Sequence, residues 1–278
     1  MLTRLLDRSG LDLGLESDLM PAAADNPDGF WENLRFVQLN DEILNALGAA
    51  WDLPPGQDET FDHGGLQPMR AKAQLLIERF SDKPVWGWKD PRNCLTFPFW
   101  RSLLPGLKTI IIIRNPLEAA YSMQKRNGTS YALGLRLWEI YNRRLLAETS
   151  PGERIIAHYQ AFFEEPEAEL RKIATFAGLD GKEAAAAAEL VAVNRRHTAF
   201  LVEQMIDAGV SERIVAFYRA LVDGTGAVPP CFVMHWGTFR LTDEPLEEPP
   251  ARFAQRWRDA GLPADANWTL AHGETRRL

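Results

Sequence analysis

Short apolar runs alternate with amphipathic helical patterns through the middle of the chain. Val85–Trp88, Thr109–Ile113 and Arg154–Tyr159 have the length and composition of strands, and a helical pattern follows each of them. Four consecutive isoleucines in the second run are typical of a strand buried on both faces of a parallel sheet. The alternation from Val85 to Ala177 therefore predicts βαβ units with right-handed crossovers, an α/β fold.

Apolar residues at helical spacing predict the remaining helices. These helices span about 1–9, 33–47, 67–80, 116–126, 131–149, 166–177, 182–193 and 200–221. The first helix starts at the first residue, with no capping residue and no strand in front of it. Beyond Gly224 the periodicity gives way to Pro-rich, mixed sequence. We therefore expect an α/β domain over 1–223 and a Pro-rich C-terminal appendage over 224–278.

Composition narrows the class of protein. The 278 residues are 46% hydrophobic and 25% charged, with a net charge of −7, which fits a globular chain and argues against a general nucleic-acid binder. No apolar run approaches the roughly 18 residues of a membrane span, and Met1–Gly10 lacks the apolar stretch of a secretion signal. We expect a cytoplasmic protein. Cys94 and Cys231 are too isolated to suggest a disulfide framework or a metal site.

Cations follow two of the expected strands, where ligands bind in parallel sheets. Arg114 precedes a helix that begins at Pro116, so a guanidinium and free backbone N–H groups together predict a phosphate site. The alternative is an arginine that pairs with a carboxylate to hold a loop. Lys89 and Asp90 are adjacent and should point to opposite faces of an extended segment. Lys89 could carry positive charge to an oxyanion, or form an ion pair at a sheet edge.

Other candidates carry weaker signals. Ser122 lies within a helix, where serines usually bond to their own backbone. Arg195-Arg196-His197 is a basic cluster whose commoner role is to favour a helix C-terminus, although Arg196 is also a candidate cofactor-binding residue. Trp86, Trp88 and Trp100 are expected in the core rather than in a base-stacking platform.

Three motifs occur in a suggestive order: WGWKDPRN (86–93), IIIIRNPLEAAYSM (110–123) and HYQAFFEEPEAELRKIATFAGL (158–179). Together with DNPDGFWENLRFVQLND (25–41), they resemble the bacterial branch of the sulfotransferase family, which uses 3′-phosphoadenosine 5′-phosphosulfate (PAPS). The likeness runs from about Leu2 to about His197. It implies a P-loop-kinase-like parallel sheet flanked by helices. It also implies in-line transfer of a sulfuryl group from PAPS to a hydroxyl or amine, without a metal.

The resemblance assigns roles to individual residues. Arg114 and Ser122 match residues that hold the 3′-phosphate of PAPS, and Tyr159 matches a tyrosine near the adenine. Gln160 and Ala161 depart from the acidic pair that follows this tyrosine in the family. Lys89 matches a lysine that stabilises charge on the moving sulfuryl group.

Two carboxylates are candidates for the base that takes the proton from the acceptor. These are Glu16 and Glu32, and the sequence does not choose between them. Glu32 could equally cap the helix that follows it.

One family feature is missing from the sequence. Family members begin with a strand and a Gly/Ser/Thr-rich loop that cradles the 5′-phosphosulfate, and here the helix that should follow that loop starts at Met1. The fold is therefore expected to be N-terminally truncated, lacking its first strand and loop. Either Met1 is an internal methionine or the protein is a degenerate binder. As written, the chain should bind PAPS poorly and turn over little.

Two other functions share the expected fold. A small-molecule P-loop kinase would need a Gly-rich loop with Lys and Ser/Thr, together with a magnesium carboxylate. A non-catalytic remnant or binding protein would need neither. A sugar, lipid, peptide or small-molecule acceptor would be selected by the loops Leu11–Gly29 and Asp52–Gly65, which carry no readable signature.

Overall fold

The computed structural model describes residues 1–23, 26–191 and 200–223, together with 231–232, 255, 258 and 267–268. The chain forms two compact units, Met1–Val210 and Ser211–Leu278. In the second unit, α11 spans Glu212–Val222, and β3 (Cys231–Phe232) pairs in parallel with β4 (Asn267–Trp268). Most of the expected Pro-rich appendage lies outside the described residues.

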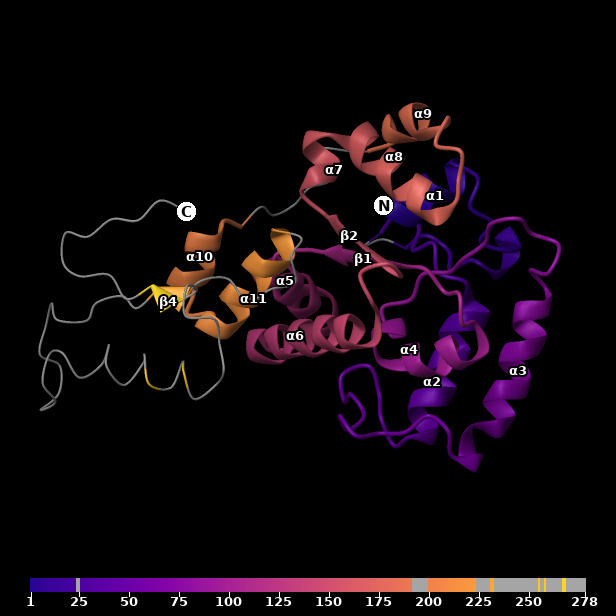
Figure 1. Cartoon of the computed structure of the whole chain (residues 1–278), viewed down its shortest axis with the longest axis horizontal. Coiled ribbons are helices and arrows are strands. Elements are labelled where there is room, and N and C mark those ends of the chain that lie inside the picture. Colours follow the sequence, from indigo (N-terminus) through magenta and orange to yellow (C-terminus); the bar gives the residue numbers. More distant parts are fainter. Residues whose placement is uncertain are drawn as a thin grey trace, which may run out of the picture. The chain divides into compact units, whose positions relative to one another are not determined.

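A two-stranded parallel sheet lies at the centre of the first unit. β1 (Thr109–Ile113) pairs with β2 (Arg154–His158), with Ile111 opposite Ile156 (Figure 1). These strands and the helices around them confirm the prediction of a mixed helix and sheet fold. The prediction of a strand at Val85–Trp88 is wrong, because this segment forms only an isolated parallel bridge between Trp86 and Asp12.

The helices of the first unit follow the predicted order. Their bounds are α1 Leu2–Arg8, α2 Leu34–Ala46, α3 Gln67–Glu78, α4 Asn93–Leu103, α5 Pro116–Asn127, α6 Tyr131–Glu148, α7 Ala161–Glu164, α8 Pro166–Ala177, α9 Ala184–Ala188 and α10 Val202–Asp207, with 3₁₀ turns η1 Glu16–Asp18 and η2 Gly64–Leu66. The helix expected over 200–221 is instead two helices. Gly209 adopts a φ of 72° after α10, a left-handed conformation that ends a helix. The helix expected over 182–193 shortens to α9.

Two large apolar clusters contribute to the core of the first unit. On one side of the sheet, α1, α8 and α9 pack against β2, around Leu5, Ala157 and Ile173 (Figure 1). The second cluster joins α2, α3 and α4 around Phe36, whose ring stacks on Trp88 at 4.4 Å between centroids. Trp86 packs against this cluster and Trp100 is fully buried within it, so the tryptophans lie in the core as predicted.

Helix α5 begins where β1 ends, and local sequence explains why. The Asn115 side chain accepts a hydrogen bond from the Leu117 backbone, and Pro116 occupies the first turn, where its missing N–H costs nothing. Gly128 closes the helix at a φ of 69°. Gly134 of α6 lies so close that an added Cβ would approach the Ala120 Cα to 2.8 Å. This contact fixes α5, and with it the residues at the carboxyl end of β1.

One face of β1 is less covered than the sequence predicts. Ile111 and Ile113 are buried, but Ile112 is 42% exposed, so the expectation of a strand buried on both faces is wrong for this residue.

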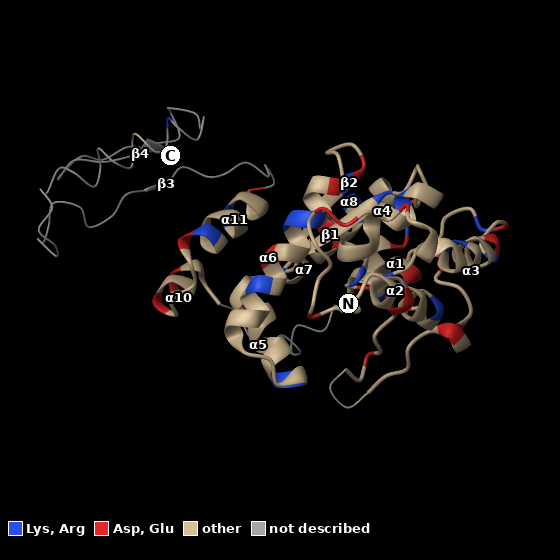
Figure 2. Ribbon diagram, turned by 90° about the horizontal axis from the view of Figure 1, so that it is seen from below, with Lys and Arg blue, Asp and Glu red and all other residues tan. Residues whose placement is uncertain are grey.

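No helix in the described part of the chain is both long enough and apolar enough to cross a bilayer. Basic and acidic positions are interspersed along the described helices (Figure 2).

Candidate active site

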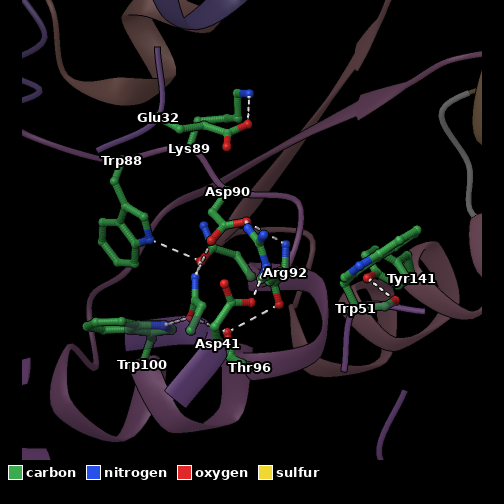
Figure 3. Close-up of polar contacts among 12 residues, drawn as sticks. Glu32, Asp41, Trp51, Trp88, Lys89, Asp90, Arg92, Thr96, Trp100 and Tyr141 are labelled. Atoms are coloured by element: carbon green, nitrogen blue, oxygen red, sulfur yellow. Dashed lines mark hydrogen bonds and ion pairs between the residues drawn. The ribbon is translucent and has the colours of Figure 1, made fainter. Parts of the chain in front are cut away.

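Lys89 meets Glu32 at the point where the Val85–Trp88 segment ends. The Lys89 Nζ forms an ion pair with the Glu32 Oε1 (Figure 3), and the side chains are 38% and 10% exposed. The backbone carbonyl of Glu32 accepts a hydrogen bond from the Met20 N–H at 2.7 Å. The cap of α2 is Asn33, whose side chain accepts from the Arg35 backbone N–H. The capping role considered for Glu32 is therefore taken by its neighbour.

Asp90 turns away from Lys89, as expected for adjacent residues on an extended segment (Figure 3). Its carboxylate is fully buried and accepts hydrogen bonds from the Arg92 side chain and from the Asn40 amide, each at 2.9 Å. A buried carboxylate requires such partners, because burial without them would cost several kcal/mol. Asp90 thus anchors the segment from which Lys89 extends.

Asn40 of α2 is the centre of this buried polar network. Its amide nitrogen donates to Asp90 and to Asn93, both at 2.9 Å. Its oxygen accepts from the Thr96 hydroxyl at 2.7 Å and the Trp100 indole at 2.8 Å. Sequence reasoning missed Asn40, because its partners lie 50 to 60 positions away. A polar residue within an apolar helix face was the only available signal.

The charges around Asp90 also shift the titration of their neighbours. Burial acts to lower the pKa of Arg92, but the charges of Asp90 and Asp41 outweigh it and raise the pKa overall. Burial, followed by the charge of Asp90, raises the pKa of the Cys94 thiol to about 12. Arg92 therefore stays protonated and Cys94 stays a neutral thiol at neutral pH.

Arg114 is held at the carboxyl end of β1 by partners from two other elements. Its Nε donates to the Glu118 Oε2 of α5 at 2.8 Å, and its guanidinium lies 4.9 Å from the centroid of the Tyr159 ring. The Trp138 indole of α6 donates to the Arg114 carbonyl at 3.0 Å. The structure therefore brings Arg114 and Tyr159 together, and it also contains the arginine–carboxylate pair considered as the alternative.

The remaining sequence candidates are more dispersed. Ser122 is half-buried on α5, two turns from its start. Glu16 is exposed in η1, and its side chain makes no hydrogen bond or ion pair with any described residue. Arg196 lies outside the described residues. Of the two carboxylates considered as a base, only Glu32 contacts Lys89.

A slot of about 610 Å³ separates the Val85–Trp88 segment from β1. Val85–Trp88 and Lys89 line it on one side, and Thr109, Ile110 and Ile112 line it on the other. Thr109 N–H donates to the Glu153 carbonyl and the Ile113 carbonyl accepts from Tyr159. Because peptide groups alternate along a parallel strand, those of Ile110 and Ile112 point away from β2. The buried Thr109 hydroxyl has no hydrogen-bond partner among the described residues.

Comparison with known proteins identifies the class of this protein. A model of the sulfotransferase family matches residues 22–183, more than half of the chain, and the chain belongs to that family. The matched region contains Glu32, Lys89, Arg114, Ser122 and Tyr159. Comparison with curated proteins and with solved structures gave no significant match. Within the described residues, no group of three His, Cys, Asp or Glu is arranged to hold a metal ion.

Proposed function

We propose that this protein transfers a sulfuryl group from PAPS to an acceptor hydroxyl or amine. The observation that carries this proposal is the pair of cation sites in a member of the sulfotransferase family. Lys89 meets the carboxylate of Glu32, and Arg114 is stacked on Tyr159. A proton acceptor beside a cation suits the acceptor end of the reaction, and a fixed guanidinium suits the donor nucleotide.

The donor end is built around Arg114. Its guanidinium, the Ser122 hydroxyl and the N-terminus of α5 would hold the 3′-phosphate, and Tyr159 would lie against the adenine. Glu118 and Tyr159 fix the guanidinium before any ligand arrives, so little side-chain entropy remains to be lost on binding. Arg196 would add a further positive charge.

The acceptor end is built around Glu32. Its carboxylate would take the proton of the acceptor hydroxyl while the acceptor oxygen forms its bond to sulfur. The bond from sulfur to the phosphate oxygen breaks, and adenosine 3′,5′-bisphosphate leaves. Lys89 would move from Glu32 towards the negative charge that spreads over the transferring group, a role that suits a point charge on a flexible stem.

A matched pair of variants tests which carboxylate is the base. Transfer from radiolabelled PAPS to a panel of sugar, phenol and amine acceptors should fall about 100-fold or more in Glu32→Gln, because general-base catalysis contributes at least that much. Glu16→Gln should retain the native rate, because this exposed side chain contacts no polar group of the described residues. The reverse ranking of the two variants would assign the base to Glu16.

We further propose that one additional strand completes a P-loop-kinase-like sheet by filling the slot between Val85–Trp88 and β1. Asp12 pairs with one edge of the Val85–Gly87 backbone, so the Trp86 peptide groups point away from Asp12. Among the described residues, the peptide groups of Ile110 and Ile112 have no hydrogen-bond partner, and neither does the Thr109 hydroxyl, which supports the same completion. Leu2 and Thr3 of α1 also line the slot. Such a strand would lead into α1 through the loop that binds the 5′-phosphosulfate.

Calorimetric titration with adenosine 3′,5′-bisphosphate tests the proposed function. The native chain should bind this product, and Arg114→Ala should weaken binding about tenfold or more, because a charge-assisted contact to phosphate is lost. Arg143→Ala is the matched control, since Arg143 pairs with Glu139 of α6 in the same way, at 2.8 Å. Tighter binding of ADP would favour a kinase. No binding by the native chain, or binding indifferent to Arg114, would refute the donor assignment.

A further inference from the structure

Two side chains at the start of α5 hold the backbone of Phe200. The Asn115 amide donates to the Phe200 carbonyl at 2.8 Å, and the Phe200 N–H donates to the Glu118 Oε1 at 2.9 Å. Asn115 and Glu118 are both 4% exposed. Buried side chains thus bind both the N–H and the carbonyl of Phe200, which lies 82 positions beyond Glu118. This two-point attachment satisfies the backbone groups as pairing with a strand would.

Glu118 joins this attachment to Arg114. Its Oε1 accepts from Phe200 and its Oε2 accepts from the Arg114 Nε at 2.8 Å. A buried carboxylate is stable only when charged or polar donors surround it, so each donor contributes to holding the carboxylate in place for the other. The Tyr121 ring meets the Phe200 ring edge-on, with centroids 6.5 Å apart, and adds an apolar contact to the same attachment.

We propose that Glu118 is a positioning residue that couples the docking of the chain at Phe200 to the orientation of Arg114. The consequence for the donor rests on the proposed function: a nucleotide phosphate bound to Arg114 should strengthen the docking of Phe200, and the docking should strengthen binding by the same factor.

Hydrogen exchange of the Phe200 amide, followed by NMR in the ligand-free protein, tests the coupling independently of any donor. Arg114→Met should accelerate this exchange about tenfold or more, because Glu118 loses the charged donor that fixes it. Arg143→Met, which breaks the equivalent pair on α6, should leave the Phe200 exchange rate unchanged. Equal rates in the native protein and in Arg114→Met would overturn the coupling.

Binding of adenosine 3′,5′-bisphosphate tests the consequence. Asn115→Asp keeps the oxygen that caps α5 but removes the donor to the Phe200 carbonyl. It should therefore accelerate exchange at Phe200 and weaken binding of the bisphosphate about tenfold. Glu118→Gln should do the same, and Glu139→Gln on α6 should do neither. Faster exchange at Phe200 with native affinity would overturn the link to the donor. If the native chain binds no bisphosphate, the proposed function fails, and the exchange in Arg114→Met still decides the coupling.

Discussion

Lys89 and Arg114 both follow extended segments of the first unit, but they are held in different ways. Among the described residues Lys89 has one carboxylate partner, Glu32, and its side chain is 38% exposed. Arg114 has a buried carboxylate at its Nε, an aromatic ring against its face and an indole donor on its carbonyl. Near Lys89, the side chain that is held firmly is that of the next residue, Asp90, which is fully buried.

This difference separates a charge that can move from one that cannot. A cation that must follow a transferring group needs freedom to move, and within the described part of the chain Lys89 has one ion pair to break. A cation that must recognise a phosphate gains from being oriented in advance, and the partners of Arg114 provide that. The stabilising contacts also lie in different places. Near Lys89 they belong to the buried network around Asp90, whereas near Arg114 they are made by the guanidinium itself.

The largest expected effect falls on the network behind Lys89. Asn40→Ala removes one residue and leaves the Asp90 carboxylate, the Trp100 indole and the Thr96 hydroxyl each short of a partner. We expect the free energy of unfolding in urea to fall by about 3 kcal/mol or more. Asn45→Ala, at an exposed position of the same helix, should change it by less than about 0.5 kcal/mol. Similar losses in both variants would mean that the network adds nothing beyond helix propensity.

The next largest effect is expected when the two basic residues are replaced by each other's residue type. Arg114→Lys keeps the charge but loses the Nε donor to Glu118 and the flat group that lies on Tyr159, so bisphosphate binding should weaken about tenfold. Lys89→Arg should alter that affinity by less than about twofold, because Lys89 contacts a carboxylate at the acceptor end. Calorimetry on both variants measures the two values. Equal weakening would show that the two cations serve one site.

The smallest effect concerns Asp18, a half-buried carboxylate that tests whether several partners suffice when those partners are themselves exposed. Its carboxylate accepts from Arg35 at 2.8 Å and from Arg79 at 2.9 Å, near the surface. The hydrogen bond from Arg35 lowers the pKa of Asp18 below its ordinary value of 3.8. The pair therefore stabilises the fold above that value and is lost as pH falls through the lowered pKa. Asp18→Asn should be slightly less stable than the native protein at pH 7 and equally stable at pH 2, by thermal unfolding. A constant difference would contradict this.

Local sequence patterns are sufficient to predict most of the helices and strands. The isoleucines of β1 and the Asn115-Pro116 start of α5 predict elements from neighbours in the chain, and both are present. Lys89 and Arg114 could be identified because strand ends are ligand positions. Asn40 and Glu118 could not, since their roles depend on partners 50 and 82 positions away. The Val85–Trp88 segment has a strand-like sequence, but a strand also needs an adjacent backbone, and a slot lies beside it.

The same slot has a consequence for the behaviour of the chain in solution. Ile110 and Ile112 present an apolar strand edge whose peptide groups have no partner in the part of the chain that the structure describes, the kind of surface through which sheet proteins associate edge to edge. Natural proteins protect such edges with charges, prolines or bulges, and β1 has none of these along its five residues. Where no additional strand fills the slot, concentrated solutions of the chain should therefore self-associate through β1. A charged substitution at Ile112, whose side chain is already exposed, is the most direct way to keep the protein monodisperse.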